Sequence, residues 1–114
     1  MGNKRKYERY YLSLYLKVIN RHNDLSVGHC VNISEGGMEL ICERSIEANI
    51  TFQLKMHLHQ EIEGSKYLNF NAVSRWSKKD ENPDFYNNGF QLNNINPEVI
   101  QVIKHLINNF SLGE

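Results

Sequence analysis

The sequence predicts a mainly β domain, in which six antiparallel strands form a barrel or a sandwich and one α-helix follows near the C-terminal end. Two observations predict the strands. Apolar and polar residues alternate through most of the chain, which is typical of strands with one buried face. Short turn-forming segments separate the alternating runs, as antiparallel connections require. A change to helical spacing in the last segment predicts the helix.

The alternating runs give the expected strands in chain order. They cover residues 12–18, 27–34, 38–43, 50–58, 68–76 and 90–92. In the first run, Leu14 is expected to share the buried face with Leu12 and Leu16. In the fifth, Trp76 is expected to pack in the core. Residues 86–89 are expected to form a turn before the last strand.

The helix is expected over residues 97–110. Asn96 can cap its N-terminus, Pro97 suits the first helical position, and Glu98 favours the positive end of the helix dipole. An apolar stripe follows, formed by Val99, Ile100, Ile103, Leu106, Ile107 and Phe110. Because a helix with one apolar face needs a surface to cover, we expect it to pack against the strands.

Composition narrows the function. The 114 residues suit one domain, and their net charge is +0. A neutral chain has no overall field to attract a nucleic-acid polymer, so any anion site must be local. The sequence has no apolar stretch of membrane-spanning length and no secretory signal. We therefore expect a cytoplasmic protein without membrane insertion.

We expect neither enzyme activity nor a metal or cofactor site. The sequence contains no nucleophile elbow, P-loop or HExxH motif. His57 and His59 have the spacing of one strand face, but no third ligand accompanies them.

Two short motifs carry the functional prediction. Residues 4–9 read Lys-Arg-Lys-Tyr-Glu-Arg, in which Arg5 and Arg9 have an RxxxR spacing just before the first strand. Arginines there can fork onto phosphate oxygens or stack on a purine. Residues 32–37 read Asn-Ile-Ser-Glu-Gly-Gly, an NxSxxG spacing. Taken alone, the first motif could be a solvated basic tail and the second an ordinary hairpin turn. Chance, however, rarely supplies both motifs in this order.

Strand alternation predicts where the second motif points. Asn32 and Ser34 are expected to share the outer face of their strand, with Ile33 in the core. Cys30 belongs to the same outer face, whereas Cys42 belongs to the inner face of its own strand. We therefore expect no disulfide between the two cysteines.

Together the two motifs resemble the PilZ family, whose members are receptors for cyclic di-GMP. The resemblance covers nearly the whole chain and implies a six-stranded antiparallel PilZ-type β-barrel with a C-terminal α-helix. It implies one domain over residues 1–114, with a flexible ligand-wrapping arm at 1–9, the barrel at 10–93 and the helix at 97–110.

The resemblance also assigns the ligand site. Arg5 and Arg9 would hold phosphates and contact guanine from the N-terminal arm. Lys4 stands where the family often has another arginine, a position expected to influence whether one or two ligand molecules bind.

The remaining ligand contacts would come from the second motif. Asn32 and Ser34 would hydrogen-bond to a guanine or a phosphate, and Gly37 would keep the backbone clear of the ligand.

A receptor of this kind would change conformation on binding cyclic di-GMP and signal to an unidentified downstream protein, or act as a homodimer. Its output would be motility, biofilm or polysaccharide control. Two alternatives remain. A PilZ-like adaptor would bind protein and no nucleotide, although such members usually lose the motif arginines that this chain keeps. A single-stranded nucleic-acid binder would use the basic arm and nearby tyrosines, but the neutral net charge speaks against it.

Overall fold

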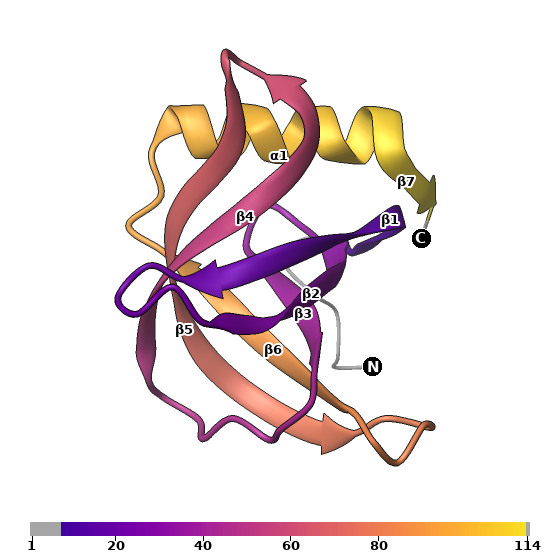
Figure 1. Ribbon diagram of the computed structural model, residues 1–114. Coiled ribbons are helices and arrows are strands. Elements are labelled where there is room, and N and C mark those ends of the chain that lie inside the picture. The colour runs from indigo at the N-terminus through magenta and orange to yellow at the C-terminus, as the bar shows by residue number, and fades with distance from the viewer. Residues whose placement is uncertain (1–7, 114) are drawn as a thin grey trace.

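The computed structural model describes residues 8–113, and strands dominate it (Figure 1). The elements, in chain order, are β1 (Tyr10–Asn20), β2 (Ser26–Ile33), β3 (Gly37–Cys42), β4 (Thr51–Ile62), β5 (Ser65–Lys79), β6 (Tyr86–Asn93), α1 (Pro97–Phe110) and β7 (Ser111–Gly113). Among these residues no helix is long and apolar enough to cross a membrane.

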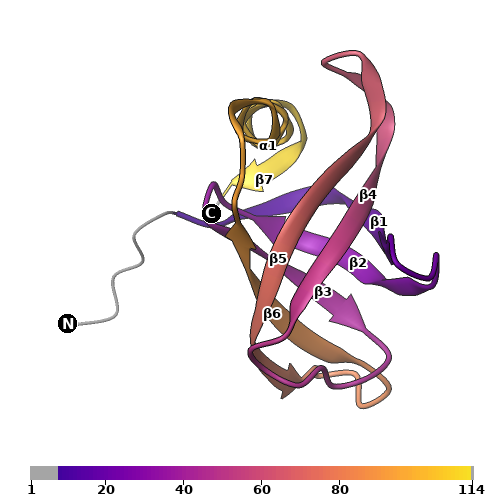
Figure 2. The ribbon, with the colours of Figure 1, turned by 90° about the vertical axis from the view of Figure 1, so that its left-hand side faces the viewer.

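The strand pairings close into a ring. All of them are antiparallel and follow the order β2-β3-β6-β5-β4-β1, and β1 also pairs with β2. The first six strands therefore form a barrel, seen from two sides in Figures 1 and 2. The predicted fold class is confirmed. The short strand β7 was not expected; it pairs with β1 outside the ring.

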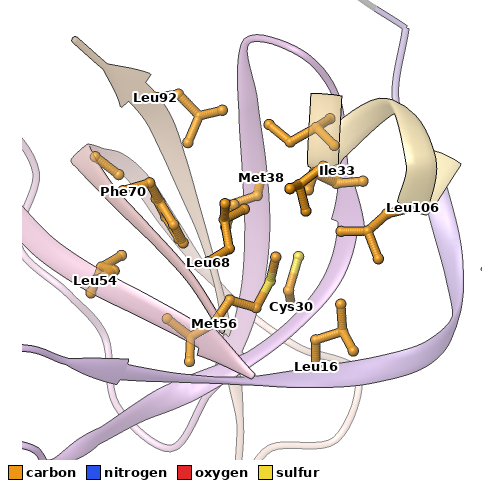
Figure 3. Close-up of a cluster of buried hydrophobic side chains, with 14 of the residues drawn as sticks. Leu16, Cys30, Ile33, Met38, Leu54, Met56, Leu68, Phe70, Leu92 and Leu106 are labelled. Carbon is orange, nitrogen blue, oxygen red and sulfur yellow. The ribbon is translucent and has the colours of Figure 1, made fainter. Parts of the chain in front are cut away.

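The barrel interior holds one hydrophobic core. Side chains from all six barrel strands and from α1 meet there (Figure 3). The helix contributes Val99, Val102, Ile103 and Leu106. It packs against β1 and β5 and lies across the upper end of the molecule in Figure 1. At its N-terminus the Asn96 carboxamide oxygen accepts a hydrogen bond from the Val99 N–H at 3.0 Å, which satisfies a helix-end donor.

β-bulges explain two wrong predictions about which residues face the core. Leu14 is 46% exposed, because the pairing of β1 with β2 shifts register between Tyr11 and Leu16 and a bulge resets the alternation of faces. Cys30 was expected to face outward but is fully buried in the core (Figure 3). A register shift lies between Cys30 and Asn32. Both cysteines are free, as expected. The expected reason, that they lie on opposite faces of the sheet, is wrong, because both are buried in the core.

The predicted turn at residues 86–89 is wrong. These residues form the first half of β6, which pairs with β3 on one side and β5 on the other. Asn88 is fully buried. Its carboxamide donates to the Arg44 carbonyl at 3.1 Å and accepts from the Ile46 N–H at 3.2 Å. The Asn88 carboxamide therefore holds the loop between β3 and β4, and it does not form a turn.

Candidate functional site

An open pocket of about 470 Å³ lies beside the turn that joins β2 to β3. Its walls come from the segment before β1, from the turn itself, and from β5 and β6. It is lined by the four predicted site residues that lie in the described part of the chain, Arg9, Asn32, Ser34 and Gly37. The other two, Arg5 and Lys4, lie outside the residues that the structure describes.

The serine of the NxSxxG motif shapes the turn. The Ser34 hydroxyl accepts hydrogen bonds from the N–H groups of Gly36 at 3.2 Å and Gly37 at 3.1 Å. The Ser34 N–H donates to the Gly37 carbonyl at 2.8 Å. Ser34 lines the pocket but is only 7% exposed. Its hydroxyl holds the wall of the pocket in a fixed shape.

The glycine of the motif allows two backbones to approach closely. A Cβ atom on Gly37 would lie 2.4 Å from the carbonyl oxygen of Phe90 on β6. The Gly36 carbonyl accepts from the Leu92 N–H at 2.9 Å. The turn is thus fixed to β6 at two neighbouring points, and only glycine fits at position 37 without moving main chain.

Asn32 lies on the outer face of β2, as expected, opposite the core residue Ile33 and paired with Glu39. Only 1% of its surface is exposed, because neighbouring side chains cover it. Its Nδ2 donates to Glu39 Oε1 at 2.8 Å. Its Oδ1 is buried without a hydrogen-bond partner. An unpaired buried acceptor is costly, and Asn32 lines the pocket. Its Oδ1 can therefore accept from an N–H group of a ligand once a neighbouring side chain moves aside, because less than 1 Å² of the atom is exposed.

Trp76 lines the pocket, so the prediction that it packs in the core is wrong. It is only half-buried, and a register shift between Ser74 and Trp76 explains this placement. Its indole lies against the backbone of Gly89, where a Cβ atom would be 2.2 Å from the ring. This leaves an aromatic face at the pocket that can stack on a base.

Two arginines bring positive charge to the pocket. The Arg9 guanidinium carbon lies 5.8 Å from the centre of the Trp76 ring, and Nη1 is 3.8 Å from Glu39 Oε1. Arg75 is exposed and donates to neutral side chains, to Gln91 at 2.9 Å and Asn49 at 3.0 Å. Hydrogen bonds to neutral groups hold the Arg75 fork without cancelling its charge, so it can serve an anion.

Cys30 lies directly behind the motif. Its thiol donates to the Asn32 carbonyl at 3.3 Å. Burial, and next the charge of Glu39, raise the pKa of the Cys30 thiol far above its ordinary value. The thiol therefore stays neutral and acts as a small apolar group of the core.

A second, wider groove lies on the other side of Arg9 and Trp76. It is lined by Tyr11, Tyr15 and Lys78, among others, and does not include Asn32, Ser34 or Gly37. Over residues 8–113 no group of three or more His, Cys, Asp or Glu side chains is placed to hold a metal ion.

Comparison with known structures supports the fold. The PilZ domain of YcgR from Escherichia coli with c-di-GMP has a TM-score of 0.71 at 17% identity, over 92% of this chain and 89% of that one. The Bacillus subtilis inhibitor of motility MotI has a TM-score of 0.72 at 19% identity, over 93% of this chain. The K. pneumonia MrkH–c-di-GMP complex has a TM-score of 0.72 at 11% identity, over 96% of this chain. This chain spans 50% of MotI and 53% of MrkH.

The comparison by sequence identifies the family. No curated protein matches the chain significantly. The model of the PilZ domain, however, matches residues 3–109, which is nearly the full length and includes both sequence motifs. The chain therefore belongs to the PilZ domain family.

Proposed function

We propose that this PilZ domain is a receptor for cyclic di-GMP and has no enzyme activity. The observation that carries the proposal is that one pocket gathers Arg9, the Asn32–Gly37 turn and the Trp76 ring. These groups come from segments far apart in the sequence, yet each suits a different part of a guanine nucleotide. Neighbours of similar fold that were solved with c-di-GMP support the same ligand.

The chemistry of the pocket matches the parts of the ligand. Cyclic di-GMP carries two phosphates and two guanines. Arg9 and Arg75 supply forked donors for phosphate oxygens or for the guanine O6 and N7 atoms. Trp76 offers a stacking face. The free Asn32 Oδ1 can accept from guanine N–H groups. A volume of about 470 Å³ falls within the usual range of small-ligand sites.

The arm at residues 1–9 would complete the site. Arg5 would hold a phosphate or a guanine, and Lys4 would influence whether one or two ligand molecules bind. If the arm orders only on binding, ligand capture changes the conformation of the chain. That change would signal in the cytoplasm to a downstream protein, or act through a homodimer, to control motility, biofilm or polysaccharide.

Isothermal titration calorimetry with cyclic di-GMP tests the proposal. We expect wild type to bind, and Arg5→Ala and Arg9→Ala each to lose about tenfold or more in affinity, since hydrogen bonds to charged groups contribute about 1.5–3 kcal/mol. Ser34→Ala should also weaken binding, because the turn that forms the pocket wall loses the hydroxyl that holds it. Arg44→Ala is the matched control. Arg44 is exposed and lies outside the pocket, so its loss should leave the affinity unchanged.

Each outcome of the titration has a distinct meaning. Folded wild-type protein that does not bind would refute the receptor and favour the protein-binding adaptor. Binding that is equal in wild type and in all three site variants would refute the site but not the ligand. Cyclic di-AMP serves as the nucleotide control, because adenine lacks the N1–H and the exocyclic N2 amino group that Asn32 is proposed to bind.

A further inference from the structure

Four cross-strand neighbours form a row beside Arg9. Trp76 on β5 pairs with Gly89 on β6, Gly89 with Glu39 on β3, and Glu39 with Asn32 on β2. Gly89 has no side chain, and the Trp76 indole lies against its backbone. The row therefore brings an aromatic ring and a carboxylate to neighbouring positions.

Arg9 lies against both members of this pair. Its Nη1 is 3.8 Å from Glu39 Oε1, and its guanidinium carbon is 5.8 Å from the centre of the Trp76 ring. The Glu39 side chain is 15% exposed and that of Arg9 is 32% exposed. Partial burial of both charges makes their attraction stronger than that of an ion pair in open solvent.

The same carboxylate oxygen also holds Asn32. Glu39 Oε1 accepts from Asn32 Nδ2 at 2.8 Å, which directs the amide nitrogen toward Glu39 and leaves Oδ1 unpaired. Glu39 therefore contacts two residues of the proposed site at once. It orients one of them by a hydrogen bond and holds the other by charge.

We infer, on the basis of the proposed function, that Glu39 sets the affinity of the site by competing with the ligand for Arg9. A phosphate that binds Arg9 must take the guanidinium from the Glu39 carboxylate, so binding breaks an existing ion pair. Arg9 is the last residue of the proposed arm at residues 1–9. Its transfer from Glu39 to a phosphate is thus a rearrangement that accompanies ligand binding.

Glu39→Gln separates the two contacts of Glu39. Its amide oxygen can still accept from Asn32, but its charge is gone. We expect its Kd for cyclic di-GMP to fall by about two- to tenfold, as expected for losing a partly exposed ion pair and a charge that repels phosphate. In an Arg9→Ala background the gain from the same change should shrink to the small part that charge repulsion supplies, because the competition acts through Arg9.

Glu35→Gln is the control. Glu35 also lines the pocket, so this variant removes an equal charge near the ligand without touching the contact between Arg9 and Glu39. We expect a smaller gain in affinity, and one that persists in the Arg9→Ala background.

The ligand-free protein gives an independent readout. Trp76 is the only tryptophan in the chain, so its fluorescence reports whether Arg9 rests on it. Glu39→Gln and Arg9→Ala should shift the emission in the same direction, and the double variant should shift it no further.

The outcomes separate this inference from the receptor proposal. If wild type binds cyclic di-GMP while Glu39→Gln binds equally or more weakly, the competition is refuted and the receptor stands. Equal gains in Glu39→Gln and Glu35→Gln would reduce the effect to general charge repulsion and would also refute it. Folded wild type that binds no cyclic di-GMP would overturn both.

Discussion

Adding one methyl group at position 89 should weaken the ligand site while leaving the fold nearly intact. In Gly89→Ala, the new Cβ would lie 2.2 Å from the Trp76 ring. No main-chain atom is among its nearest contacts. Trp76 is half-buried at the rim of the pocket, so its ring can turn away and relieve the overlap. The pocket then loses its stacking face.

The expected magnitudes differ for stability and binding. Uncovering a few tens of Å² of indole at about 25 cal/mol per Å² costs about 1 kcal/mol. Replacing glycine by alanine returns about 0.4–1 kcal/mol by restricting the unfolded chain. The free energy of unfolding should therefore change by less than about 1 kcal/mol. Stacking contributes about 1–3 kcal/mol per base, so affinity for cyclic di-GMP should fall about 5- to 100-fold.

Three measurements on Gly89→Ala check this reasoning. Urea unfolding gives the stability, tryptophan fluorescence without ligand gives the environment of Trp76, and calorimetry gives the affinity. We expect nearly unchanged stability, a shifted emission maximum and weaker binding. A variant with wild-type emission and wild-type affinity would refute the placement of Trp76 over Gly89. Trp76→Phe, which keeps a smaller aromatic face, should retain part of the affinity.

Three further predictions concern the fold. Gly37→Ala should lower the free energy of unfolding by about 2–3 kcal/mol in urea, because its Cβ would meet the Phe90 carbonyl oxygen at 2.4 Å and main chain must move. Asn88→Ala should lower it by about 2–4 kcal/mol, because two loop backbone groups between residues 44 and 46 lose their buried partner. The raised pKa of the Cys30 thiol means that the unfolded chain ionises first, so stability should fall as pH rises above about 9.0.

Each of these predictions has a control or a contradicting result. Asn69→Ala removes an exposed strand asparagine and should cost less than about 0.5 kcal/mol. If Asn88→Ala costs no more than that, the loop does not depend on the Asn88 carboxamide. Wild-type stability in Gly37→Ala would contradict the close approach of β3 to β6. Cys30→Ala should flatten the loss of stability above pH 9.0, and an unchanged profile would assign that loss to other groups.

The fold was predictable where its signals are local. Alternation in β4 places Leu54, Met56 and Leu58 in the core, and all three are buried. The Asn96 cap and Pro97 mark the start of α1. Bulges were not predictable, because they depend on which strand lies alongside and in which register.

In the candidate site, too, features with a local sequence signal were predictable and features set by strand register were not. The spacing of the NxSxxG motif directs attention to Asn32 and Ser34, and both line the pocket. Their burial was missed, because it comes from contacts with other residues: Glu39 holds the Asn32 amide, and the Ser34 hydroxyl is turned toward the N–H groups of Gly36 and Gly37. Trp76 and Glu39 reach the site through cross-strand register. Register joins residues far apart in the chain and leaves no local pattern.

The most direct test of the receptor is a titration of the ¹⁵N-labelled chain with cyclic di-GMP, followed by ¹H–¹⁵N correlation spectra. The sole tryptophan gives one indole N–H signal, and Gly37, which also lines the pocket, gives a backbone signal. Both should shift and saturate together, while Gly64, at the turn between β4 and β5, should not move. Saturating nucleotide that leaves the indole and Gly37 signals in place would contradict the proposed site.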